Sequence, residues 1–107
     1  LASVDLKRLS PALLKKFSAK PPYASQRNFG ASALDWCYTA TGRYDVYLHG
    51  GQKLWDYAAG ALIGEESGSY ACCIDQDEFA QGDVWQRSVV AARDATVFEE
   101  WKTWIRQ

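Results

Sequence analysis

The sequence predicts an α/β fold, in which strands and helices alternate along the chain and pack as layers. Short stretches in which every second side chain is apolar, such as residues 44–48, are typical of strands. Longer stretches with apolar side chains three and four positions apart, such as residues 97–105, are typical of helices. Helix-capping residues precede most of the helical stretches, and glycine or proline follows most of them.

A strand and then a helix are predicted first. Residues 2–6 alternate in side-chain polarity, which indicates a short strand. Ser10 is suited to cap a helix that has Pro11 as its first residue, because proline needs no hydrogen-bond partner there. The helix should end before the prolines that begin the segment 21–28, which we expect to be an extended or looped connection.

A second helix and a second strand are predicted to follow. Ser32 and Asp35 are spaced as in a capping box, and we expect the helix that they begin to end at Gly42. Residues 44–48 then form a strand. The two glycines at 50–51 are expected to end it.

The rest of the chain is predicted to contain two helices and two strands. Residues 53–63 form a helix that is apolar almost all round, so we expect it to be buried and to end at Gly68. Strands are predicted at 69–74 and 87–92, and Asp94 can cap a last helix. The apolar side chains of that last helix are expected to face the core: Val97, Phe98, Trp101, Trp104 and Ile105.

Length and composition limit the class of protein. A chain of 107 residues forms one domain, which we expect to span 1–107, and its 48% hydrophobic content excludes a disordered chain. No apolar stretch approaches the roughly 20 residues needed to cross a membrane, so we expect no membrane partner. The three cysteines lack the spacing of a zinc site. We expect three reduced thiols and a cytoplasmic location.

The net charge is only −1, but basic side chains are concentrated near the amino terminus. Such a region could face phosphate or nucleic acid, or it could be a solvated helix face. Aromatic residues are not interleaved with it as in proteins that stack bases, so we expect no nucleic-acid partner. Residues 1–30 contain these six basic side chains against Asp5 alone: Lys7, Arg8, Lys15, Lys16, Lys20 and Arg27.

One carboxylate stands at the start of the most apolar helix. An ionised Asp56 needs a partner there, because burying an unpaired charge is costly. The free N–H groups and the dipole of the helix supply part of that partnership. A metal ion would supply more. The residues alone leave two interpretations open, a metal ligand or a first-turn aspartate that suits the dipole.

Two segments carry a resemblance to a known family. The first, from Arg27 to Asp45, reads RNFGASALDWCYTATGRYD, and the second, from Trp55 to Gly68, reads WDYAAGALIGEESG. Both resemble signature segments of the inositol monophosphatase family, whose members are magnesium-dependent phosphatases of small phosphate monoesters. The resemblance covers most of the chain, from about Ser3 to its end.

The resemblance implies a fold, an activity and a site. It implies the C-terminal domain of the family's α/β sandwich, with a mixed sheet and flanking helices. It also implies hydrolysis of a small phosphorylated substrate similar to inositol phosphate, with Asp56 as a ligand of Mg²⁺. Gly30, Ala31 and Ser32 match the backbone segment that contacts the substrate. They open a helix, whose free N–H groups suit a phosphate or a hydroxyl.

His49 departs from the family pattern. The family has at this position a glutamate that holds sugar hydroxyls, whereas a neutral histidine offers one donor and one acceptor. His49 is therefore a candidate substrate contact, with a strand-end residue bonded to the backbone as the alternative. The departure also leaves open a related phosphatase of a sugar or nucleotide bisphosphate.

The resemblance also implies that part of the enzyme is missing. In the family an Asp-Pro-x-Asp-Gly-Thr motif, with a preceding Glu-Glu pair, holds most of the metal ions and activates water. The motif does not occur here, since no aspartate precedes any of the three prolines, and the chain begins with Leu1. We expect the C-terminal half of such an enzyme, with the missing N-terminal half or a second chain as partner and a tendency to form a homo-oligomer. The alternative is a non-catalytic α/β module for binding or dimerisation.

Overall fold

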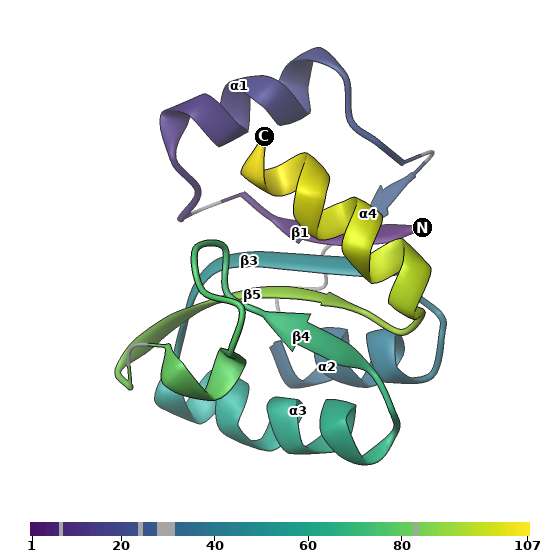
Figure 1. The fold of residues 1–107 in the computed structure, drawn as a ribbon, viewed down its shortest axis with the longest axis vertical. Helices are drawn as coiled ribbons and strands as arrows, with labels where there is room; N and C mark the ends of the chain where they lie inside the picture. The colour runs from purple at the N-terminus through teal and green to yellow at the C-terminus, as the bar shows by residue number, and fades with distance from the viewer. Residues whose placement is uncertain (7, 24, 28–31, 83) are drawn as a thin grey trace.

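A single mixed sheet of five strands forms the centre of the molecule, in the order β2-β1-β3-β5-β4 (Figure 1). The computed structural model describes residues 1–6, 8–23, 25–27, 32–82 and 84–107, and only the backbone of 27 and 32–34. β1 is parallel to β2 and β3, whereas β5 is antiparallel to β3 and β4. The strands are β1 (Ala2–Asp5), β2 (Gln26–Arg27), β3 (Val46–Lys53), β4 (Tyr70–Cys72) and β5 (Gln86–Ala92).

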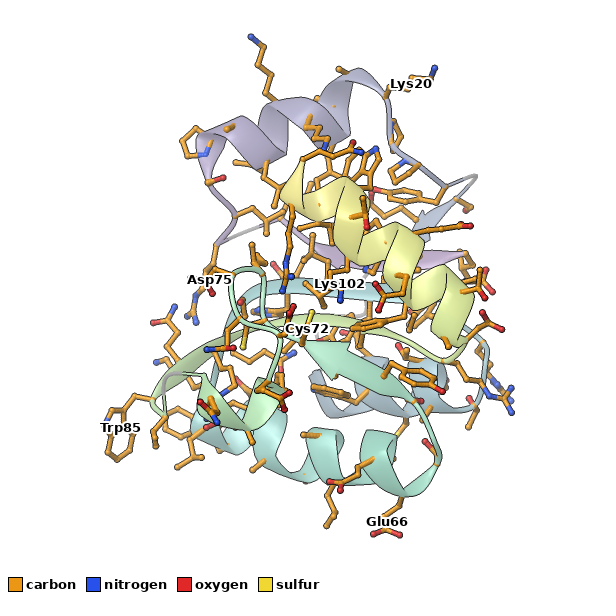
Figure 2. The ribbon with its side chains drawn as sticks, viewed as in Figure 1. Lys20, Glu66, Cys72, Asp75, Trp85 and Lys102 are labelled. Atoms are coloured by element: carbon orange, nitrogen blue, oxygen red, sulfur yellow. The ribbon has the colours of Figure 1, made fainter. Side chains whose placement is uncertain are left out.

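Helices cover both faces of the sheet, which confirms the predicted α/β fold with flanking helices (Figure 1). α1 (Pro11–Ala19) and α4 (Ala95–Arg106) pack on one face, and α2 (Ser32–Ala40) and α3 (Leu54–Glu66) on the other. A short 3-10 helix, η1 (Phe79–Gln81), precedes β5. Figure 2 shows Lys20, after α1, and Glu66, at the end of α3, pointing away from the sheet on opposite sides of the molecule.

The helix ends follow the signals in the sequence. The side chain of Ser10 accepts a hydrogen bond from the backbone N–H of Leu13 at 3.2 Å, which caps α1. The side chain of Asp94 accepts one from the N–H of Val97 at 3.0 Å and caps α4 in the same way. α3 ends just before Gly68, whose φ of +83° is in the left-handed region that favours glycine.

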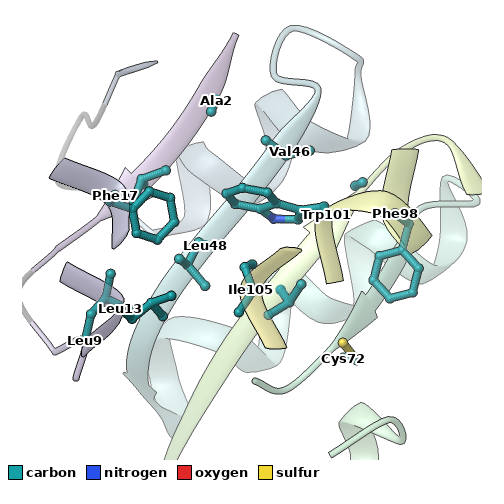
Figure 3. Packing of buried hydrophobic residues seen from close by; sticks show 13 residues of the cluster. Ala2, Leu9, Leu13, Phe17, Val46, Leu48, Cys72, Phe98, Trp101 and Ile105 are labelled. Atoms are coloured by element: carbon teal, nitrogen blue, oxygen red, sulfur yellow. The ribbon is translucent and has the colours of Figure 1, made fainter. Parts of the chain in front are cut away.

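The larger core lies between the sheet and the helices α1 and α4. Figure 3 shows Phe17 of α1 and Trp101 of α4 packed beside Leu48 of β3. The Phe17 and Trp104 ring centroids are 4.8 Å apart, and the Trp101 indole N–H donates to the backbone oxygen of Tyr47 at 3.0 Å. The tryptophans of the last helix therefore face the core, as predicted.

The second core, between the sheet and the helices α2 and α3, is centred on Trp36. A Cβ atom at Gly60 of α3 would lie 2.2 Å from Cδ1 of Trp36, so only glycine allows the two helices to approach this closely. The Trp36 indole N–H donates to Oε1 of Gln52 at 3.0 Å, and the Gln52 amide donates to the Tyr47 hydroxyl. This core therefore contains buried polar groups, each joined to another.

The prediction that the glycines at 50–51 end their strand is wrong. β3 continues to Lys53, because its register against β5 shifts between His49 and Gln52 and then resumes. The extra residue forms a β-bulge, which bends the strand without ending it. Glycine is common both at the end of a strand and in a bulge within a strand, and only the pairing with β5 distinguishes the two.

The prediction that the Trp-Asp helix is buried is also wrong. One side of α3 packs on the sheet through Tyr57, Gly60 and Gly64, but the other side is open. Trp55 is 71% exposed and Leu62 is 58% exposed, since α3 is the outermost layer of the described chain on this side. Among all the residues that the structure describes, no helix is long and apolar enough to cross a membrane. We call the open side the outer face of α3: Trp55, Ala58, Ala59, Leu62 and Ile63.

We expect Gly60→Ala to lower the free energy of unfolding by about 1–3 kcal/mol, because the new methyl group would overlap Trp36. Gly64→Ala is the matched control in the same helix, since its Cβ would lie 3.4 Å from Trp36, an ordinary contact. The control should be neutral or gain up to about 1 kcal/mol from helix propensity. Urea unfolding followed by circular dichroism measures both, and equal effects would contradict this account of the packing.

Candidate functional site

The candidate site lies at the edge of the sheet where the parallel strands have their carboxyl ends. β1 and β3 both end on the left of Figure 1, and α3 starts there directly after β3. β2 is parallel to β1, so α2 begins toward the same edge. In open α/β sheets ligands bind beyond this edge, near the loops and the helix starts.

Asp56 lies in the first turn of α3, at this edge. Its side chain is half-buried, and no described residue donates a hydrogen bond to its carboxylate or forms an ion pair with it. Lys53 caps the helix only with its backbone, because its side chain makes no capping bond. The free N–H groups and the dipole of the helix start favour a negative charge in this turn.

The described residues provide one carboxylate of a magnesium site and not a complete site. Among them, no three His, Cys, Asp or Glu side chains gather closely enough to hold a metal ion. Mg²⁺ in proteins keeps several waters and takes one or two carboxylates together with phosphate oxygens. The half-buried Asp56 fits one such position. The remaining ligands would have to come from another segment or another chain.

His49 lies within β3, in register with Asp5 at the end of β1. Its Nε2 is 3.3 Å from Oδ2 of Asp5, and each of the two side chains is 14% exposed. Its Nδ1 accepts a hydrogen bond from the backbone N–H of Gly51 at 3.0 Å. The sequence left two roles open for His49, a substrate contact or a strand-end residue bonded to the backbone. The bond to the backbone is present, but His49 lies inside β3 and not at its end.

The other predicted substrate contacts are only partly within the described residues. Ser32 is the first residue of α2, but its side chain is outside what the structure describes. Gly30 and Ala31 lie entirely outside the described residues. Their contact with substrate therefore stays a prediction.

A buried carboxyl next to the site was not found by sequence reasoning. Asp35 is 3% exposed and Ser3 is 1% exposed, and Ser3 Oγ donates to Oδ1 of Asp35 at 3.0 Å. Burial raises the pKa of Asp35, the Ser3 hydrogen bond lowers it, and the charge of Asp5 raises it further. The sequence assigned Asp35 only a capping role. The alternation in β1, which places Ser3 and Asp5 opposite Val4, was the available signal.

Comparisons with known proteins decide the family. The model of the inositol monophosphatase family matches residues 3–105. The chain belongs to the inositol monophosphatase family. It is 37% identical over 95 residues to the Nus factor SuhB of Haemophilus influenzae, a match covering 86% of this chain and 34% of that protein. It is 51% identical over 43 residues to the inositol-1-monophosphatase of Mycobacterium bovis, covering 40% of this chain and 15% of that protein.

A solved member of the inositol monophosphatase family has the same fold. The crystal structure of inositol monophosphatase II from Staphylococcus aureus aligns with a TM-score of 0.77 and 20% sequence identity. The alignment covers 97% of this chain and 40% of that chain. The present chain therefore spans less than half the length of each of these three relatives.

In the present chain, three parts of the predicted site lie at one edge of the sheet. Asp56 and the start of α2 follow strands that end there, and His49 lies beside Asp5 at the end of β1. Lys53 is also at this edge, with its Nζ 5.4 Å from the ring centroid of Trp55. Asp56 and His49 thus lie at the same edge of the sheet as the start of α2, whereas Gly30 and Ala31 lie outside the described residues, and the roles of all these residues in binding are predictions.

A cavity of about 500 Å³ lies between α3, η1 and β4, and its lining includes neither Asp56 nor His49. Trp36, Tyr57 and Phe79 form aromatic walls. The Arg87 guanidinium is 4.3 Å from the ring centroid of Tyr57 and 5.0 Å from that of Phe79. Leu62 also lines the cavity, so the cavity is continuous with the outer face of α3.

We expect Asp35→Asn to become more stable relative to the wild type as the pH rises from 3.8 toward neutrality. The folded state raises the pKa of Asp35 above its ordinary 3.8, so it binds the proton more tightly than the unfolded chain does. The stability contributed by this carboxyl is therefore lost as the pH rises through the folded pKa. Asparagine does not ionise and can still accept from Ser3. Urea unfolding at a series of pH values measures the difference, and a difference independent of pH would contradict the account.

Proposed function

We propose that this chain is the C-terminal part of a magnesium-dependent phosphatase that hydrolyses a small phosphate monoester similar to inositol phosphate. One observation carries the proposal: the half-buried carboxylate of Asp56 has no partner among the described residues. Its carboxylate is a hard oxygen ligand of the kind that Mg²⁺ takes, and a divalent cation would supply the missing partner. The name of the mycobacterial relative, inositol-1-monophosphatase, supports the same reaction.

Each proposed residue has a distinct task. Asp56 would hold one magnesium ion with a hard oxygen ligand at the start of α3. The N–H groups of Gly30, Ala31 and Ser32, where α2 begins, would bind the phosphate or a hydroxyl of the substrate. The chemistry available from bound Mg²⁺ is a lower pKa of water and stabilisation of both oxygens in an in-line displacement.

The outer face of α3 is the proposed contact for the rest of the enzyme. The chain covers 34% of the Haemophilus influenzae relative, so most of such a protein would lie outside this chain. Trp55 and Leu62 are more than half exposed, and exposed apolar patches of this kind mark interaction surfaces. An N-terminal half, or a second chain, that covers this face would also stand near Asp56. It could then supply the missing metal ligands.

Two other functions remain as alternatives. A non-catalytic binding or dimerisation module is favoured by the single carboxylate, and the relatives named Nus factor SuhB are consistent with a role other than hydrolysis. A related phosphatase of a sugar or nucleotide bisphosphate is favoured by His49, which replaces a carboxylate acceptor with an imidazole.

We expect Asp56→Asn to lower turnover at least about 100-fold once the chain is combined with the part of the Haemophilus influenzae relative that it does not cover. Loss of a direct ligand should exceed the roughly 10–100-fold cost of losing an outer-shell residue. Glu66→Gln is the matched control, since Glu66 is exposed at the other end of α3 (Figure 2). Phosphate release from inositol phosphate, titrated with Mg²⁺, is the measurement. Near-normal turnover in Asp56→Asn would refute the metal assignment.

We expect the chain alone to self-associate at micromolar concentration, because the outer face of α3 is then uncovered. Leu62→Lys should shift the chain toward the monomer, since it places a charge on that face. Ser18→Lys is the control, because it adds the same charge to an exposed position of α1 on the opposite side of the sheet. Sedimentation velocity measures all three proteins. A strictly monomeric wild type would contradict the proposed contact face.

A further inference from the structure

Two hydrogen bonds and one close packing contact fix the bulge at Gly50 and Gly51. The Gly51 N–H donates to Nδ1 of His49 at 3.0 Å, and the Gly51 carbonyl accepts from the Arg8 guanidinium at 2.6 Å. At Gly50 a Cβ atom would lie 2.4 Å from the backbone of Arg8, so the loop before α1 packs directly on the bulge. Side chains from two separate segments therefore fix a backbone distortion that the ladder alone does not fix.

The hydrogen bonds determine how the imidazole of His49 is protonated. Nδ1 accepts from Gly51, so this nitrogen carries no proton and the ring is neutral. The proton is then on Nε2, which is 3.3 Å from Oδ2 of Asp5. Asp5 thus selects the tautomer in which Nδ1 is available to the bulge. Both ring nitrogens are engaged inside the protein.

The bulge lies directly upstream of the candidate metal ligand. After it, Gln52 pairs with Arg87 and Lys53 pairs with Gln86, and α3 begins at the next residue. Asp56 follows in the first turn of that helix. A bulge changes the direction of a strand and of the side chains after it, so its geometry sets the direction in which β3 delivers α3.

We propose that His49 is a positioning residue for Asp56, and that Asp5 acts on Asp56 through His49. The neutral imidazole holds the Gly51 N–H and so fixes the bulge from which α3 and its first-turn carboxylate depart. This inference rests on the proposed function in one respect, since it takes Asp56 as the metal ligand. It replaces the substrate contact that the sequence suggested for His49 with an indirect role.

Two substitutions separate the positioning role from a substrate contact. In His49→Asn, the side-chain oxygen stands near the place of Nδ1 and can accept from the N–H two residues on, as in an Asx turn. In His49→Gln, the amide reaches the place of Nε2 and can meet Asp5, but it leaves the Gly51 N–H unbonded. The positioning role is kept by asparagine and lost in glutamine, whereas a substrate contact through Nε2 is kept by glutamine.

The first readout is independent of metal and of catalysis. His49 is the single histidine of the chain, so its imidazole nitrogens give one set of ¹⁵N NMR signals. We expect an unprotonated Nδ1, a protonated Nε2 and a coupling from the Gly51 amide to Nδ1. Hydrogen exchange of the Gly51 amide should rise about tenfold in His49→Gln, as expected for one lost hydrogen bond, and stay near the wild type in His49→Asn. A protonated Nδ1 in the wild type, or equal exchange in the two variants, would overturn the proposal.

The second readout is the affinity for Mg²⁺ without substrate, measured by calorimetry on the chain combined with the uncovered part of the Haemophilus influenzae relative. We expect His49→Gln to weaken binding roughly 10–100-fold and His49→Asn to change it little. Normal Mg²⁺ affinity in His49→Gln, with a raised KM in His49→Asn, would overturn the positioning role and return His49 to the substrate. If Asp56→Asn leaves the Mg²⁺ affinity unchanged, the proposed function fails and the link to Asp56 fails with it. The tautomer and the Gly51 exchange then still test the clamp on the bulge.

Discussion

The parallel pairing of β1 with β3 determines where the candidate functional residues lie. Its register places Asp5 opposite His49, and it directs both strands to end at the same edge of the sheet. β2 continues the parallel order on the other side of β1. α2 and α3 therefore both start toward one edge of the sheet, the edge at which ligands bind in open α/β folds. A one-residue slip would turn Asp5 to the opposite face and separate it from His49.

The two faces of the sheet are built differently, and the difference bears on function. The face under α1 and α4 is apolar and aromatic, which suits a layer that only stabilises the fold. The face under α2 and α3 contains buried polar pairs, such as Ser3 with Asp35 and Trp36 with Gln52. Buried polar groups are costly unless each finds its partner, so such pairs specify one arrangement of strand and helix. The polar face is also the one from which the candidate site is assembled.

The features that could be predicted from the sequence are those set by neighbours along the chain. The caps of α1 and α4 and the first-turn place of Asp56 depend on a few adjacent residues, and they were found. The predictions that β3 ends at its two glycines and that α3 is buried both failed. The first depends on the pairing of β3 with β5, and the second depends on what covers the outer face of α3. The contact of His49 with Asp5 joins residues 44 positions apart, and no local pattern encodes that register.

The central claim is that Asp56 binds a divalent metal ion at the carboxyl edge of this sheet. The most direct measurement is a crystal structure of the chain combined with the uncovered part of the Haemophilus influenzae relative, grown with Mn²⁺ in place of Mg²⁺. The account predicts an anomalous scattering peak at coordination distance from a carboxylate oxygen of Asp56, with the remaining ligands from the added segment and from water. Bound manganese elsewhere, with none at Asp56, would contradict the account.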